Sequence, residues 1–437
     1  MTNHRVAALM LSAAVGLPSS AAAQSGPVDP LHERIDRAAG QVMSKVVEWR
    51  RDFHQHPELG NREVRTAGVI ADHLRRLGLE VRTGVAKTGV VGVLRGAKPG
   101  PVVALRADMD ALPVTEETDL PFKSTVRAEY NGREVGVMHA CGHDGHMSML
   151  MGAAEVLAGM RADLPGAVVF IFQPAEEGAP AGEDGGAPLM IAEGALDNPK
   201  VEAIFGLHVF PFEAGGIAVR PGGFMAASDT LAITVRGRQT HGALPWQGVD
   251  PIVVASQIVL ALQPIISRQA DLTTAPAVIT LGVFQAGNRS NIIPDEARLE
   301  GTIRTFDAAM QRQIHERVRR TATLVAEAAG AAAEVAITTG NPVTFNDPAL
   351  TQQMLPTLAR VAAGPFEPNA RVTTTAEDFS AYQQKVPGVF FFLGVAPKGV
   401  DPASAEPNHS PRFLLDEEAL VTGVRALASL AVDYLRR

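Results

Sequence analysis

Four short segments of the chain are continuously apolar, and polar or charged residues follow each of them. Runs of this length are typical of strands buried on both faces, as in a parallel sheet covered by helices. Apolar residues at helical spacing lie between the runs and again near the C-terminus. This alternation predicts an α/β fold with a mixed, mostly parallel sheet and helices on both faces. The four predicted strands are residues 102–105, 168–172, 203–207 and 389–393.

The middle of the chain follows a different pattern. Leu231, Ile233 and Val235 alternate with polar residues, which indicates a strand with one solvated face. The order of elements there is β-α-β-β-α-β, the ferredoxin-like arrangement of an α+β domain. It predicts a small domain over residues 224–341, inserted into a larger domain formed by residues 24–223 and 342–437. The further elements are a helix from Asp250 to about residue 266, strands at 277–284 and 297–305, a helix after Asp307 and a strand at 334–338.

Residues 1–23 have the features of a signal peptide. His4 and Arg5 form a short basic region, residues 6–17 are apolar, and residues 21–23 supply the small side chains of a cleavage site. The apolar run is too short to cross a bilayer. We therefore expect export of the mature chain to the periplasm or out of the cell. No later segment is long and apolar enough to predict a membrane span.

The composition is that of a folded two-domain protein without a nucleic-acid partner. The chain has 437 residues, with 46% hydrophobic and 20% charged residues. Its net charge is −8 and its Lys and Arg residues are dispersed, so we expect no surface that binds a phosphate backbone. Cys141 is the single cysteine. It cannot form an internal disulfide, and it remains a candidate core residue, intermolecular linker, nucleophile or metal ligand.

Polar side chains with catalytic potential follow the predicted buried strands. In open α/β sheets, ligands bind beyond the carboxyl ends of the strands. We therefore expect these side chains to lie along one edge of the sheet. They are Asp108 and Asp110 after the first strand, Glu176 and Glu177 after the second, His208 at the end of the third and His409 beyond the fourth.

The segment 139–146 is the densest group of metal-binding side chains. It holds Cys141, three histidines and Asp144 within eight positions. A thiolate and an imidazole suit zinc or another borderline divalent ion. Each residue alone could instead pack in a core or cap the next helix. The cluster as a whole favours a metal site, because buried polar groups need partners.

Glu176 and Glu177 form an adjacent pair of carboxylates. Neighbouring residues at a strand end point in different directions, so one can hold a metal while the other faces the substrate. The second carboxylate could then take a proton from a metal-activated water. A solvated acidic turn is the alternative interpretation of this pair.

The motifs together resemble the M20 metallopeptidase family, in its branch of amidohydrolases that act on hippurate and auxin conjugates. The resemblance extends over essentially all of the mature chain, and the motifs in this order are highly specific. The segments that carry it are 53–58, 106–113, 138–144, 173–177, 206–208 and 409–411.

The resemblance implies a site for two divalent ions (Zn, Mn, Co or Ni), with Glu176 as the general base. Asp110 stands where the family has an aspartate that orients the metal site. Asp108 replaces a histidine that binds metal in the wider family. The implied metal ligands are Cys141, His143, Glu177, His208 and His409.

The resemblance also implies that the large domain is catalytic and that the small domain is a lid through which a homodimer forms. His241 would reach the partner's active site and stabilise the oxyanion, and Asn291 and Arg304 would hold the substrate carboxylate. This sequence departs from the family pattern at two positions. Trp246 stands where many relatives have a histidine, and Asn408 stands where leucine is frequent.

The implied reaction is metal-dependent hydrolysis of the amide bond of N-acyl amino acids or related small amides. A dipeptidase or carboxypeptidase that uses the same site is the nearest alternative. Two other classes stay open: a hydrolase with Cys141 as nucleophile and a histidine as base, and an exported two-lobed binding protein without chemistry.

Overall fold

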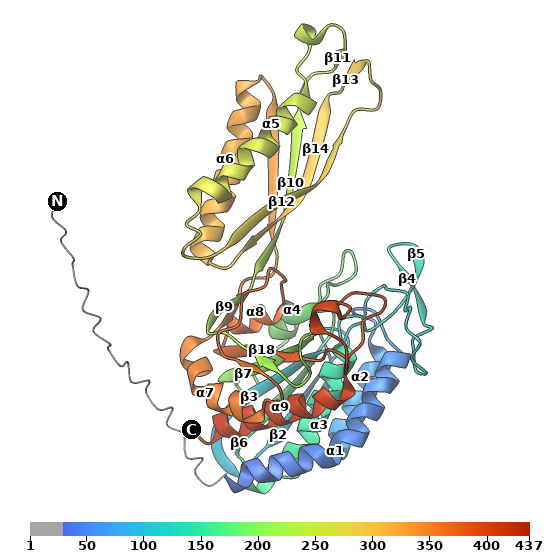
Figure 1. Ribbon diagram of the computed structural model, residues 1–437, viewed down its shortest axis with the longest axis vertical. Helices are drawn as coiled ribbons and strands as arrows, with labels where there is room; N and C mark the ends of the chain where they lie inside the picture. The colour runs from blue at the N-terminus through green and yellow to red at the C-terminus, as the bar shows by residue number, and fades with distance from the viewer. Residues whose placement is uncertain (1–28) are drawn as a thin grey trace, which may run out of the picture.

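The computed structural model describes residues 29–437. Residues 1–28, which contain the predicted signal peptide and its cleavage site, lie outside the described residues, so export stays a prediction. The described chain forms a large domain from which a smaller domain projects, and the two meet at a narrow neck (Figure 1).

The large domain is built on a mixed sheet of eight strands. At its centre, β3 runs parallel to β6 and β7, and β7 runs parallel to β18. β2 is antiparallel to β6, and β8 is antiparallel to β18. All four predicted strands are confirmed, as β3, β6, β7 and β18. In sheet order the strands are β1 (Glu80–Val85), β2 (Gly89–Arg95), β6 (Pro165–Gln173), β3 (Lys98–Asp108), β7 (Ala203–Phe210), β18 (Gly388–Gly394), β8 (Ile217–Ala218) and β17 (Phe366–Glu367).

Helices cover both faces of this sheet, as predicted. The longer helices bury their apolar sides in one core with the sheet, and the short helices α4 (Gly186–Ala192) and α8 (Phe379–Gln383) pack in a second core on the other face. α3 is buried almost throughout, so both its apolar and its polar side chains lie inside the protein. The longer helices are α1 (Pro30–Gln55), α2 (Val64–Arg76), α3 (His143–Ala158), α7 (Pro348–Val361) and α9 (Leu420–Leu435).

The small domain has a four-stranded antiparallel sheet in the order β12-β14-β10-β15. The burial of β10 alternates along the strand, as its sequence pattern predicts. The chain leaves the large domain through β9 (Gly222–Met225) and returns through β16 (Thr344–Asn346), and these two strands pair at the neck. The predicted limits at residues 224 and 341 stay a prediction. The elements in chain order are β10 (Ala227–Arg236), α5 (Pro251–Pro264), β12 (Ala277–Ala286), β14 (Glu296–Thr305), α6 (Ala308–Ala328) and β15 (Ala332–Thr339).

Two short two-stranded sheets extend from the domains, and the first is a hairpin. β4 (Arg127–Tyr130) and β5 (Arg133–Gly136) project from the large domain on the side of the small one (Figure 1). β11 (Thr240–His241) and β13 (Ile292–Ile293) pair at the far tip of the small domain.

α5 corrects one expectation from the sequence. The helix continues into a π-helical turn, and the 19 residues Pro251–Gln269 are long and apolar enough to cross a membrane by length and composition. The expectation that no segment after the leader meets this criterion was therefore wrong. Val254, Ile258 and Leu262 are buried on the small sheet, whereas Leu260 is 71% exposed. The helix is apolar because both its packed side and part of its open side carry aliphatic residues.

Candidate metal centre and active site

The predicted site residues meet at one edge of the large sheet. β3, β6 and β7 are adjacent and parallel, so the residues after β3 and β6 come close to His208 near the end of β7. The start of α3 adds Cys141 and His143 at the same place. Gly142 between them has a φ of 93°, and a Cβ at this position would lie 2.4 Å from a methyl group of Val209. Glycine is therefore needed for the chain to turn this closely against β7.

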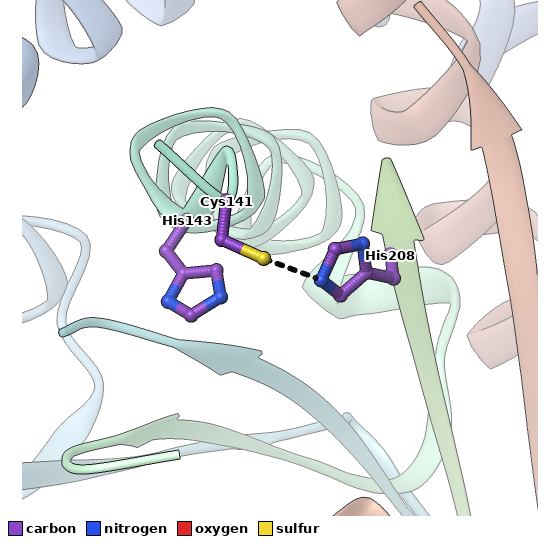
Figure 2. A group of neighbouring side chains, drawn as sticks. All are labelled: Cys141, His143 and His208. Carbon is purple, nitrogen blue, oxygen red and sulfur yellow. Dashed lines mark hydrogen bonds between the residues drawn. The ribbon is translucent and has the colours of Figure 1, made fainter. Parts of the chain in front are cut away.

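Cys141 lies between two imidazoles. Its Sγ is 3.2 Å from Nε2 of His208, and the rings of His143 and His208 lie on either side of the thiol (Figure 2). The ring Nδ1 of His208 donates to the carbonyl oxygen of Val209 at 2.8 Å, and Nδ1 of His143 donates to that of Asp110 at 2.8 Å. Both histidines are thereby oriented with Nε2 toward a common point, and the ligand atoms of all three residues lie within 4.8 Å of one another.

Glu177 and His409 complete the group from two other segments. Nε2 of His409 is 3.2 Å from the Cys141 Sγ and 3.0 Å from Oε1 of Glu177. Nε2 of His143 is 4.0 Å from the same carboxylate oxygen. All five predicted ligands thus gather around the Cys141 thiol, although they are spread over 269 positions of sequence, from 141 to 409.

The chemistry of this group fits divalent ions. Nε2 of His143 is buried and has no hydrogen-bond partner among the described residues. Burial and the nearby carboxylates of Glu177 and Glu176 raise the pKa of Cys141 well above its usual value. A bound cation would reverse this effect, because it favours the thiolate. The mixture of sulfur, nitrogen and oxygen ligands suits borderline ions such as zinc.

Asp108 and Asp110 hold the residues around this group. Asp110 Oδ2 accepts a hydrogen bond from the backbone N–H of Glu177 at 3.0 Å, and Oδ1 lies 3.4 Å from Nδ1 of His143. Asp108 is fully buried and its Oδ1 lies 2.6 Å from Nδ1 of His146. Although burial alone would lower it, Asp108 and Asp110 raise the pKa of His143 to about 10.

His146 belongs to the metal-binding motif but is already engaged at both ring nitrogens. Its Nε2 accepts a hydrogen bond from the backbone N–H of Val209 at 2.9 Å, and its Nδ1 donates to Asp108. His146 therefore orients β7 and Asp108 rather than offering a free ligand atom.

Glu176 faces a different set of carboxylates from Glu177. One of its oxygen atoms lies within 4.8 Å of oxygen atoms of Glu377 and Asp378, and Glu176 also lies within 4.8 Å of ligand atoms of His143 and Glu177. Arg106 compensates this charge, since its Nη2 is 3.0 Å from Glu377 and 2.9 Å from Asp378. Burial, and next Glu377, raise the pKa of Glu176 well above its usual value. Glu377 and Asp378 were not predicted from the sequence, because no apolar strand precedes them to signal their position.

The predicted lid residues divide between two places. Arg304 lines a cavity of about 430 Å³ together with Cys141, Glu176 and His409. His241 and Asn291 instead line a separate cavity at the tip of the small domain, beside Arg289. Within one chain, the structure therefore brings Arg304 to the metal-binding group but not His241 or Asn291.

Comparison with known proteins identifies relatives over most of the chain. The model of Peptidase family M20/M25/M40 matches residues 104–433. Thermostable carboxypeptidase 1 of Saccharolobus solfataricus is 39% identical over 407 residues, which cover 92% of this chain and 99% of the relative. N-acetylcysteine deacetylase of Bacillus subtilis is 39% identical over 394 residues, which cover 90% and 97%. The crystal structure of a dinuclear metal-binding peptidase of the M20 family from Bacillus subtilis superposes with a TM-score of 0.77 at 37% identity, over 91% of this chain and 99% of that chain.

Proposed function

Because the chain belongs to peptidase family M20/M25/M40 and is a metal-dependent amide hydrolase, we propose that it cleaves the amide bond of N-acylated amino acids. The observation that carries the proposal is the gathering of five ligands around Cys141 in the same cavity as Arg304. The ligands would hold the metal ions that amide hydrolysis requires, and the guanidinium of Arg304 would bind the carboxylate of the substrate.

Two divalent ions fit the ligand set. One group consists of Cys141, His143 and His208, the other of Cys141, Glu177 and His409, and these residues would hold the ions. When bound, such ions would polarise the amide carbonyl and make a water molecule acidic enough to lose a proton near neutral pH. Zinc, manganese, cobalt and nickel all accept these ligands.

Glu176 is the proposed proton carrier. Its neighbour Glu177 is one of the proposed metal ligands. Glu176 belongs to neither of the two ligand groups that contain Cys141, and it lines the cavity of Arg304. It would take a proton from the attacking water as the oxygen adds to the amide carbon. It would then deliver that proton to the nitrogen as the C–N bond breaks, which releases a carboxylic acid and an amine.

Arg304 is the proposed anchor for the carboxylate of the substrate. It forms no salt bridge within residues 29–437, and burial lowers its pKa although the more distant charge of Asp229 acts in the opposite direction. A guanidinium that is partly withdrawn from water and lacks an acidic partner is suited to bind the carboxylate of a ligand. Ser228 and Asn341 line the same cavity and offer further hydrogen bonds.

The small domain is the proposed lid and dimerisation domain. Its β-α-β-β-α-β order supports a ferredoxin-like lid. Leu260 and Val253 on α5 are exposed, as are Val278 and Phe284 on the edge strand β12. A second copy that covered these side chains would form a homodimer. His241, which lies apart from the site of its own chain, would then act on the oxyanion in the partner's site.

A substrate panel tests this function against the alternative of a carboxypeptidase, the activity in the name of the Saccharolobus solfataricus relative. Purified protein loaded with each metal would be offered N-acetyl and N-benzoyl amino acids, free dipeptides and N-blocked dipeptides. The proposal expects the highest kcat/KM on the acylated single amino acids. Preference for the dipeptides would contradict it. Glu176→Gln should keep the metal content and lower kcat by about 100-fold or more.

A further inference from the structure

A second cavity adjoins the metal-binding group at Glu177. It has a volume of about 440 Å³, and we call it the hairpin cavity because residues 129–131 of the β4–β5 hairpin form one side of it. Segment 110–113 and segment 177–183 form other walls. Glu177 lines both this cavity and the cavity of Arg304, so the two spaces meet at a proposed metal ligand.

The inner walls of the hairpin cavity are apolar. Leu59 and Ala111 are buried and form a small core of their own with Val137, separate from the cores of the main sheet. Leu112 and Pro113 are half-buried and line the cavity beside them. Among the charged lining residues, Asp110 and Glu177 belong to the end of the cavity that adjoins the metal-binding group. Arg62 binds Glu183 at 2.6 Å, and Glu129 is exposed.

Backbone hydrogen bonds hold these walls in place. The N–H of Ala111 donates to the carbonyl oxygen of Glu58 at 2.8 Å, and Leu112 and Met138 exchange two hydrogen bonds at 3.0 Å. Asp110, which precedes this wall, binds the backbone of Glu177. The wall is therefore preformed and fixed in position relative to the metal-binding group.

We propose that the hairpin cavity receives the acyl group of the substrate. This inference rests on the proposed function. An N-acyl amino acid has a charged half and an uncharged half on the two sides of its amide bond. Arg304 suits the charged half, so the uncharged half is left for the apolar space that adjoins the site at Glu177. Since the cavity is far larger than an acetyl group, the chemical class it fits is an aromatic or medium-chain acyl group.

Leu112→Trp tests the proposal by filling the cavity. The ratio of kcat/KM for an N-benzoyl amino acid to that for the N-acetyl derivative of the same amino acid should fall by about 10-fold or more, because the larger acyl group loses its space. Leu324→Trp makes the same change on α6, where Leu324 is 51% exposed and lines neither cavity. This control should leave the ratio unchanged.

A second variant and a binding measurement keep the test independent of the folding of Leu112→Trp. Tyr130 is 41% exposed, so Tyr130→Ala should fold, and it should lower the same ratio by removing one wall. In a Glu176→Gln background, calorimetry should show that Tyr130→Ala weakens binding of the N-benzoyl compound more than that of the N-acetyl compound.

The outcomes separate this inference from the proposed function. A wild-type protein that hydrolyses no N-acyl amino acid would contradict the proposed function and the acyl site with it. A protein that hydrolyses both compounds, but whose variants leave the ratio and the relative binding unchanged, contradicts the acyl site alone. Selectivity that follows the amino-acid side chain instead of the acyl group also overturns the assignment.

Discussion

The carboxylate of Glu63 holds the backbone of Ala175, the residue that precedes the two glutamates of the site. Its Oε1 accepts the N–H of Ala175 at 3.0 Å, and its Oε2 accepts the hydroxyl of Thr88 at 2.6 Å. Ala175 has a φ of 51°, a left-handed conformation that is unfavourable for alanine. Glu63 is fully buried, so this contact fixes the turn that sends Glu176 and Glu177 in different directions.

Glu63 should make the stability of the metal-free protein depend on pH. Burial, and next the charge of Asp110, raise the pKa of Glu63 from 4.5 to about 7. The folded state therefore binds more protons than the unfolded state between these values, and stability falls as the pH rises through this window. Glu63→Gln keeps the acceptor for Ala175 and removes the titration. Urea unfolding should show that the free energy of unfolding falls between pH 5 and pH 8. This fall should be smaller in Glu63→Gln than in wild type by up to roughly 3 kcal/mol.

Glu327→Gln on α6 is a matched control, because Glu327 is exposed. It should retain the pH dependence of the wild type. If Glu63→Gln and wild type lose stability equally over this range, the buried carboxylate does not titrate as the structure indicates.

Asn408 should support metal affinity through the backbone rather than as a ligand. Its Nδ2 donates to the carbonyl oxygens of Cys141 at 2.9 Å and Val209 at 3.2 Å, which ties the loop of His409 to the rest of the site. Asn408→Leu removes both bonds and keeps a side chain of similar size. Metal affinity, measured by competition with a chelator, should fall by about 10-fold or more.

The exposed Asn369 gives a control of the same chemistry, because Asn369→Leu lies outside the site. It should keep the metal affinity of the wild type. Unchanged affinity in Asn408→Leu would mean that the loop of His409 is held by its other contacts, such as the bond from the His409 N–H to Ala140.

The sequence predicts the centre of the large sheet well and its edge poorly. β3, β6, β7 and β18 are buried on both faces. A strand buried on both faces needs apolar residues at consecutive positions, so each of them appears as a continuous apolar run in the sequence. β2 is also buried, but Gly89 and Gly92 interrupt its pattern. A Cβ at Gly92 would lie 2.8 Å from a terminal methyl group of Leu74, which would have to move. Its neighbour β1 is mostly exposed and carries no apolar signal.

The same contrast holds for the site. The proposed ligands follow strands or belong to a compact motif, so their residue types and positions identify them. Glu63 begins a helix, and Glu377 lies in a loop, so each has the local sequence of a solvated carboxylate. Only the packing of distant segments buries them, against Ala175 in one case and Arg106 in the other. That information is not present in either local sequence.

Removal of metal should stop hydrolysis, which distinguishes the proposed function from catalysis by a cysteine nucleophile. Burial and the nearby Glu177 raise the pKa of Cys141, so the metal-free protein holds a neutral thiol, which is a poor nucleophile. Dialysis against a chelator should abolish turnover, and addition of zinc, manganese, cobalt or nickel should restore it. Turnover that persists without metal and is lost on alkylation of Cys141 would identify a cysteine hydrolase instead.

His241 should act in the site of the partner subunit, and mixed dimers can show this. His241→Ala and Glu176→Gln should each be inactive alone. If His241 acts across the dimer, a heterodimer of the two variants contains one site with both an intact Glu176 and an intact His241 from the other subunit. Equal mixing after subunit exchange should then restore about a quarter of wild-type activity, since half of the dimers are mixed and each has one complete site.

A site that uses His241 of its own chain gives no activity on mixing, because every chain then carries one defect. Leu260→Glu provides the structural companion to this experiment. It places a charge on the exposed apolar side of α5, and it should shift the protein to monomers in sedimentation while the metal content stays at the wild-type level. Within one chain His241 lines a cavity separate from the metal-binding group, so monomers that retain full activity would show that catalysis does not use His241.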